Sequence, residues 1–159
     1  MAGAVSYRVA TSHDAPAMLA CHGSEPADTR VAAYLDGEHH PQQALRPRVA
    51  YIAVVENEVV GYVAGHLTTR NSCAGEVQYL FVNPDYRRRG IGSELLQRLA
   101  DWFTSQDARR VCVPIANDSP LEAKPFVESL GAIPIRRYWY GWDDIGQLLM
   151  GYRRMRCGD

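Results

Sequence analysis

Three consecutive arginines, residues 87–89, stand directly before the segment Gly90-Ile91-Gly92. An apolar run precedes them, and a helical pattern of apolar residues begins at Ile91. A turn from a strand into a helix leaves the first helix amides without partners and places the positive end of the helix dipole there. Glycines let those amides approach an anion closely, and arginines add positive charge. The junction therefore predicts a phosphate or pyrophosphate site; the alternative is a basic turn that caps the helix and binds nothing.

Two other phosphate-binding motifs are absent, since the sequence has no G-x-x-x-x-G-K-[ST] and no G-x-G-x-x-G after its first predicted strand. The spacing Arg87-x-x-Gly90-x-Gly92 instead resembles the acyl-CoA binding motif of the GNAT superfamily of N-acetyltransferases. The motif follows the segment LFVNP at residues 80–84 and precedes the helical segment ELL at residues 94–96. The similarity extends more loosely from the first predicted strand to about residue 155.

The resemblance implies that the amides of this loop hold the pyrophosphate of coenzyme A. It also implies that the strand before the loop is splayed from its neighbour, with the acyl-pantetheine bound along it. A backbone amide at the strand's end, that of Phe81 or Val82, would then face the thioester oxygen and stabilise its developing negative charge. Asn117 resembles a family asparagine that contacts the cofactor. The residues predicted to bind acetyl-CoA are Leu80, Phe81, Val82, Arg87, Arg88, Arg89, Gly90, Ile91, Gly92, Ser93 and Asn117.

Acyl transfer to an amine needs a base, because an ammonium with a pKa of about 10.4 is almost fully protonated at neutral pH. Glu76 matches the position at which some histone-acetylating members of the family carry a general-base glutamate. It can equally be a solvated residue at the start of a strand. The family often protonates the departing thiolate with a tyrosine, but this position is Val127 here, and Ala132 replaces a usual phenylalanine. Tyr138, Tyr140 or water would then have to serve.

Substrate recognition in this family comes mostly from the first two helices and the last hairpin. Here they carry Glu38, His39 and His40 and the segment YWYGWDD at residues 138–144. Aromatic rings beside carboxylates can receive a cationic amine, but the same residues can also cover a hairpin or form a dimer interface. We expect no metal site, because the two histidines have no further ligands at suitable spacing.

The elements that must position these residues follow from hydrophobic periodicity and turn residues. A helix is expected to begin near Asp14, capped by Thr11 or Ser12. Hairpins and strand–helix–strand crossovers both occur, which favours an α+β (mixed α/β), GNAT-like fold. Its central sheet is expected to be mixed and mostly antiparallel, with about six to seven strands flanked by about four helices. Strands are predicted at residues 7–10, 48–55, 59–68, 76–82, 110–115, 133–140 and 147–155, and the further helices at residues 26–40, 91–106 and 121–130.

The composition is that of an ordinary globular domain, with 47% apolar and 22% charged residues among 159. We expect a single domain over residues 1–159. A net charge of −1 argues against a general nucleic-acid binder. The four cysteines form no C-x-x-C pair and there is no targeting or membrane-spanning segment, so a cytoplasmic protein with reduced thiols and no membrane partner is expected.

The function expected from these features is an acetyl-CoA-dependent N-acetyltransferase. It would transfer an acetyl group from acetyl-CoA, its cosubstrate, to a primary amine of a small molecule or peptide by direct attack in a ternary complex. A covalent acyl-cysteine route is disfavoured, since Cys73 and Cys112 have no evident base partner. A homodimer is left open. The alternative, motivated by Val127 and Ala132, is a non-catalytic acyl-CoA-binding sensor or interaction module with the same fold.

Overall fold

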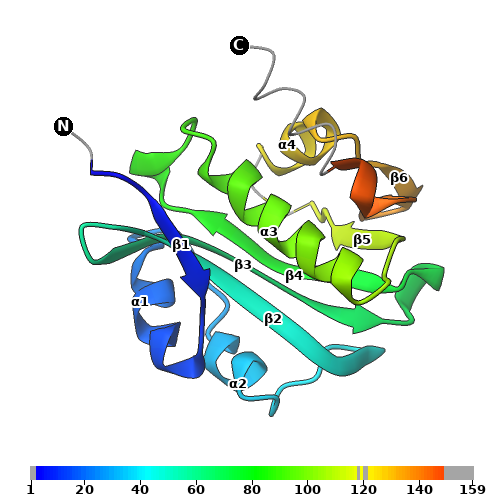
Figure 1. The fold of residues 1–159 in the computed structure, drawn as a ribbon, viewed down its shortest axis with the longest axis horizontal. Coiled ribbons are helices and arrows are strands. Elements are labelled where there is room, and N and C mark those ends of the chain that lie inside the picture. Colours follow the sequence, from blue (N-terminus) through cyan, green and yellow to red (C-terminus); the bar gives the residue numbers. More distant parts are fainter. Residues whose placement is uncertain (1–2, 118, 120–121, 149–159) are drawn as a thin grey trace.

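One seven-stranded sheet forms the centre of the computed structural model, which describes residues 3–117, 119 and 122–148 (Figure 1). The strands lie in the spatial order β1-β2-β3-β4-β5-β7-β6. Each neighbouring pair is antiparallel except β4 with β5. The predicted fold class is therefore confirmed. The strands are β1 (Ser6–Val9), β2 (Ala44–Val55), β3 (Glu58–Thr68), β4 (Gly75–Val82), β5 (Val111–Pro114), β6 (Ile133–Arg136) and β7 (Trp139–Trp142).

Helices cover both faces of the sheet (Figure 1). On one face lie α1 (Ala15–Ala20) and α2 (Val31–Leu35), and on the other lie α3 (Ile91–Ser105) and α4 (Ala123–Ser129). Short 3₁₀ turns precede α1, follow β3 and follow β4; they are η1 (Ser12–Asp14), η2 (Arg70–Ser72) and η3 (Pro84–Tyr86). Among the described residues, no helix has the length and apolar character needed to cross a bilayer.

The apolar face of α3 forms the centre of the larger core. Leu95, Leu99 and Phe103 recur at the helical period and are fully buried against the sheet, together with Val63 of β3. A second core lies under α1 and α2, where the largest fully buried side chains are those of Met18, Tyr34, Ile52 and Tyr62. The side chains of β4 divide between these two cores, so β4 lies between two packed layers.

The predicted hairpin between β2 and β3 is confirmed. Its two turn residues, Glu56 and Asn57, have φ angles of 49° and 68°. A two-residue turn with both φ angles positive matches the right-handed twist of the flanking strands.

Three predicted elements differ from the structure. The strand expected over residues 133–140 is two strands, β6 and β7, because the chain turns at Tyr138, whose φ is 70°. The helix expected over residues 26–40 is only Val31–Leu35. The strand expected over residues 147–155 is wrong where it is described, since residues 145–148 are helical; residues 149–155 lie outside the described part of the chain.

Candidate functional site

β4 and β5 pair only at their first residues. Gly75 lies beside Val111 and Glu76 beside Cys112, and beyond this point the two strands diverge. β4 continues to Val82, paired with β3 on its other side. Its first three residues are buried and its last five only half-buried. The splayed strand that the resemblance implied is therefore present, with an edge that has no strand partner among the described residues.

The amides of this open edge follow from strand geometry. Asn83 donates its backbone N–H to the carbonyl oxygen of Val60 in the strand β3, 2.8 Å away. Successive residues of a strand direct their N–H groups to opposite edges. The N–H group of Phe81 therefore also faces β3, whereas the N–H groups of Leu80 and Val82 face the open edge. This geometry favours Val82 over Phe81 for the thioester oxygen, and it adds Leu80 as a second donor; both roles stay predictions.

The loop after β4 has the backbone of an anion site. Arg88 and Gly90 have φ angles of 64° and 80°, and Gly90 is the N-cap of α3. Left-handed residues in such a turn direct backbone amides into a concavity that binds anions, and the dipole of the fifteen-residue helix α3 adds to it. Gly92 packs closely on α4, since a Cβ there would lie 3.3 Å from the ring of Phe126.

The three arginines of the loop have different environments. Arg87 is tied down, since its Nε donates to the carbonyl oxygen of Val82 at 2.9 Å and its Nη2 donates to Glu25 at 3.0 Å. Arg89 and Arg88 are exposed, and the guanidinium of Arg89 lies 5.0 Å from the ring centre of Tyr86. The side chain of Arg87 thus holds the end of β4 in place, which leaves Arg88 and Arg89 as the side chains able to reach a phosphate. Ile91, Gly92 and Ser93 begin α3, as predicted.

His22 packs against the end of β4, a contact that the sequence does not predict. Its ring stacks on Phe81 with the centroids 3.6 Å apart. Its Nδ1 lies 3.0 Å from the carbonyl oxygen of Pro26, which can only accept, so Nδ1 carries the proton and Nε2 accepts from the hydroxyl of Tyr62. Burial lowers the pKa of His22 below its ordinary value. A lone histidine in a polar segment gives no local signal of such packing.

The fold should lose stability in mild acid through His22. Its folded-state pKa lies below the unfolded value of about 6.5, so between the two the unfolded chain binds more protons and stability falls as the pH falls. We expect the drop in melting temperature from about pH 7.5 to about pH 5.5 to be smaller in His22→Gln than in wild type. The exposed His13→Gln is the matched control and should behave as wild type; an equal drop in all three proteins contradicts this role of His22.

Glu76 is buried at the point where β4 and β5 part, with 3% of its surface exposed. The solvated interpretation of Glu76 is therefore wrong. Its Oε1 lies 3.1 Å from Nε of Arg70 and 3.8 Å from Nε2 of His66, which is fully buried. The hydroxyl of Tyr34 lies 2.9 Å from Nδ1 of the same histidine. A carboxylate can only accept, which favours the tautomer with a proton on Nε2 facing Glu76 and with Nδ1 accepting from Tyr34.

The residues considered as general acids differ in their exposure to solvent. Val127 is buried in the core next to α3, with 2% of its surface exposed, and Ala132 is buried as well. Tyr140 is half-buried and packs against the same core. Tyr138 is 39% exposed, and its hydroxyl accepts from the side-chain amide of Asn117 at 3.5 Å. Asn117 is exposed, and its predicted contact with the cofactor stays a prediction.

Several of the residues predicted to recognise the amine already form contacts within the chain. His40 Nδ1 lies 2.8 Å from Nη2 of Arg48, and the carbonyl oxygen of His39 accepts from Nη1 of the same arginine at 3.0 Å. The ring of Trp139 lies 5.1 Å from the guanidinium of Arg70. Glu38 is exposed. Within the described part of the chain, no group of three or more His, Cys, Asp or Glu side chains could hold a metal ion.

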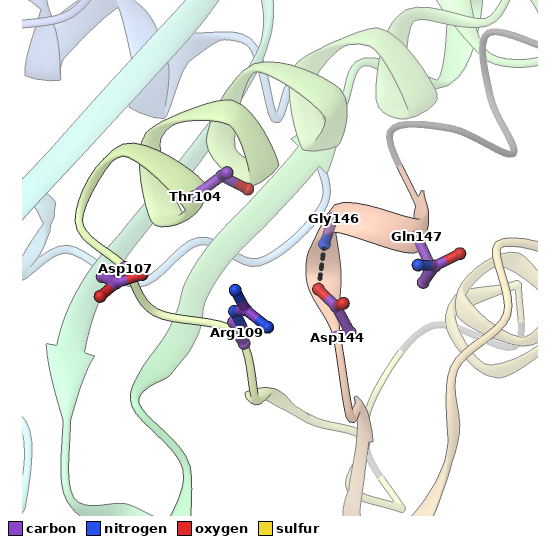
Figure 2. Close-up of a pocket in the computed structure, with 6 residues that line it drawn as sticks. All are labelled: Thr104, Asp107, Arg109, Asp144, Gly146 and Gln147. Carbon is purple, nitrogen blue, oxygen red and sulfur yellow. Dashed lines mark hydrogen bonds between the residues drawn. The ribbon is translucent and has the colours of Figure 1, made fainter.

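An open pocket of about 270 Å³ lies at the other end of α3 (Figure 2). At about 1.5 Å per residue, α3 separates it from the Gly90 loop by roughly 20 Å. The pocket is therefore distinct from the open edge of β4 and from the loop. Its lining residues are Thr104, Asp107, Arg109, Asp144, Gly146 and Gln147, with a carboxylate oxygen of Asp144 accepting from the Gly146 N–H at 2.9 Å.

Comparison with known proteins gives one family and many similar folds. Residues 18–132 match the acetyltransferase (GNAT) family. A mycothiol acetyltransferase of Amycolatopsis mediterranei (strain U-32) is 43% identical over 76 residues, which are 47% of this chain and 21% of that protein. The chain thus spans about a fifth of the length of this curated relative.

Two solved structures illustrate the shared fold. A GNAT-family acetyltransferase from Staphylococcus aureus Mu50 superposes with a TM-score of 0.71 at 16% identity, covering 87% of this chain and 98% of that one. The PaiA N-acetyltransferase from Thermoplasma acidophilum, solved in complex with coenzyme A, has a TM-score of 0.65 at 13% identity and covers 87% and 96% of the two chains. At these identities the comparison shows a shared fold and no more.

Proposed function

The chain belongs to the acetyltransferase (GNAT) family, and we propose that it transfers an acetyl group from acetyl-CoA to a primary amine by direct attack in a ternary complex. One observation carries the proposal: β4 parts from β5 and runs directly into a loop with left-handed residues at Arg88 and Gly90 that opens α3. The loop amides would hold the pyrophosphate. The thioester would then lie along the open edge of β4, within reach of its backbone donors.

In the proposed reaction the amine nitrogen attacks the thioester carbonyl carbon, forming a C–N bond as the C–S bond breaks. The N–H groups of Leu80 and Val82 are the candidates for stabilising the charge on the carbonyl oxygen. At about 3.3 Å per residue, Leu80 lies roughly 13 Å along the strand from Glu76 and Val82 roughly 20 Å, which favours Leu80 when Glu76 is the base. Glu76 accepts the amine's proton, directly or through a water molecule. The electron pair of the broken bond leaves on the sulfur of coenzyme A, whose thiol has a pKa of about 8.5 and can depart as the thiolate. A tyrosine at position 127 is therefore not obligatory.

The environment of the cysteines supports direct attack over an acyl-cysteine intermediate. Cys112 is adjacent to Glu76 across the sheet but fully buried, and burial raises the pKa of its thiol. Burial likewise raises the pKa of Cys73. A buried neutral thiol is a poor nucleophile, because the thiolate is the reactive form.

Amine-dependent release of free coenzyme A tests this function against a non-catalytic acyl-CoA sensor, which the buried Val127 keeps as the second candidate. We expect acetyl-CoA alone to be stable, and addition of an acceptor from a panel of small amines and peptides to give stoichiometric release of thiol and acetylated product. Binding of acetyl-CoA with no acetylation across the panel supports the sensor instead.

A further inference from the structure

A strained turn covers the buried Glu76. In η2, Asn71 and Ser72 have φ angles of 56° and 58°. Consecutive non-glycine residues in the left-handed region are costly, and surrounding contacts must hold them there. The contacts are present: the backbone oxygen of Asn71 accepts from Arg110 at 3.5 Å, and its side-chain oxygen accepts from Nη1 of Arg136 at 3.3 Å. The turn is thus held by Arg110, directly before β5, and by Arg136 of β6.

Buried polar atoms without a protein hydrogen-bond partner gather at this turn. Buried polar groups in proteins are nearly always hydrogen-bonded, whereas most of these atoms are held only by ion-pair contacts, which leaves hydrogen-bonding capacity for a polar partner from outside the chain. Two of the residues are more than nine-tenths buried, since Glu76 is 3% exposed and His66 not at all. Of the eight such atoms in the described part of the chain, the five at this turn are Nε2 of His66, Nε of Arg70, Nδ2 of Asn71, Oε1 of Glu76 and Nε of Arg110.

The ion pair between Arg70 and Glu76 is incomplete in its geometry. The two atoms are 3.1 Å apart, yet neither Nε of Arg70 nor Oε1 of Glu76 forms a hydrogen bond with the residues that the structure describes. The side chain of Arg70 is 22% exposed and that of Glu76 only 4%. The guanidinium of Arg70 is therefore the more accessible of the two charged groups. It is held in place by the carbonyl oxygen of Gln42, at 2.9 Å, and by the ring of Trp139.

The charge around the turn is positive. Arg70 faces Glu76, and Arg110 lies 3.4 Å from the exposed carboxylate of Asp143. Arg136 contacts the Asn71 amide, and no carboxylate among the described residues lies within ion-pair distance of it. Three guanidinium groups thus face two carboxylates. A ligand that supplies acceptor oxygens and a negative charge complements this surface.

We propose that the acceptor is a primary amine that also carries a carboxylate, in the manner of a free α-amino acid; this rests on the proposed acetyl transfer. Its carboxylate binds the guanidinium of Arg70 and the side-chain amide of Asn71, with Arg136 adding charge. Its amine lies at Glu76, which takes the proton. Amine and carboxylate stand on one carbon of an α-amino acid, so a single molecule can bridge a guanidinium and a carboxylate that are already in contact.

This assignment changes the expected role of the aromatic and acidic segment 138–144. Trp139 packs on the guanidinium of Arg70, and Asp143 lies 3.4 Å from Nε of Arg110, so both already contact a cation of this chain. Charge-assisted bidentate pairing makes arginine the side chain suited to a planar carboxylate. The surface beside Glu76 therefore selects an anionic group on the acceptor.

Matched sets of acceptors test the proposal. Each set contains an α-amino acid, its primary amide, and the amine of the same skeleton without the carboxylate, and kcat/KM is measured from coenzyme A release. Wild type should prefer the amino acid over its amide by about 10- to 100-fold in at least one set, the size expected for a charge-assisted pair. Arg70→Gln should reduce this ratio to within about threefold while leaving the KM for acetyl-CoA unchanged.

Two further variants separate recognition from folding. Arg136→Gln, an exposed substitution, should lower the same ratio by about three- to tenfold. Arg46→Gln, on the exposed part of β2, is the matched control and should keep the wild-type ratio. A structural role of Arg70 would lower the rates for amino acid and amide alike, so only a change in their ratio supports carboxylate recognition.

The outcomes for this site and for the proposed reaction can be told apart. If wild type and Arg70→Gln both acetylate amides or simple amines as fast as amino acids, the carboxylate site is overturned. The proposed N-acetyltransferase activity is then still supported. Absence of any acetylation overturns the reaction. In that case the carboxylate site is tested by the rise in melting temperature that amino acids cause when coenzyme A is present. A rise that is lost in Arg70→Gln supports the site. No rise in wild type overturns it.

Discussion

Gly90→Asp should abolish the rise in melting temperature that acetyl-CoA causes in the wild-type protein. At a ligand concentration of about 100 times Kd, binding to the folded state alone adds about 2.7 kcal/mol, or roughly 5–10 °C for a chain of this size. No atom of the described residues lies within 4 Å of a Cβ at Gly90, so the substitution causes no clash with them. The loss comes from a carboxylate placed at the N-terminus of α3, where the phosphate would bind.

The strain of the substitution needs its own control. Aspartate at a φ of 80° costs some stability whatever the site does. Gly37 has a φ of 78° and an equally open Cβ position, but it follows α2, so Gly37→Asp reproduces the strain away from the loop. We expect Gly37→Asp to keep the full shift with acetyl-CoA. Equal shifts in wild type and in a folded Gly90→Asp protein remove the pyrophosphate assignment.

Local patterns in the sequence predicted the elements whose signals are contiguous. The helix expected at residues 91–106 is Ile91–Ser105, and the hairpin expected around residues 56–58 is present. The break at Tyr138 was missed because a tyrosine at a φ of 70° is rare, and nothing in the sequence marks it as a turn residue. The segment 26–40 was overpredicted as helix because tertiary packing fixes only its central five residues in that form.

The surroundings of Glu76 could not be predicted because they depend on strand register. The pairing of β3 with β4 shifts by one residue between Ala64 and Gly65, which places His66 opposite Glu76. Without this bulge, Val77 would lie opposite His66 and the side chains would change faces. Arg70 reaches Glu76 from a 3₁₀ turn with two consecutive left-handed residues, Asn71 and Ser72, and a single asparagine in the sequence does not predict such a pair. The Gly90 loop, in contrast, is a single contiguous segment and was predictable.

Glu76→Gln should slow acetyl transfer by about 10²- to 10⁴-fold, the usual cost of removing a general base. The KM for acetyl-CoA should change little, because Glu76 lies at the start of β4 whereas the pyrophosphate loop begins after its end. Glutamine keeps the size and shape of the side chain, but it cannot take a proton from the amine. The exposed Glu58→Gln, at the start of β3, is the matched control and should retain the wild-type rate.

The pH dependence of the rate separates a base from a structural carboxylate at position 76. If Glu76 accepts the proton, wild type should show an acidic limb in kcat/KM that Glu76→Gln lacks, since the limb reports the essential base of the free enzyme. If Glu76 only holds Arg70 and His66 in place, the variant should melt at a lower temperature and lose its preference for carboxylate-bearing amines, with the acidic limb unchanged. An unaltered rate and pH profile would therefore place the base elsewhere and leave Glu76 as the buried partner of Arg70.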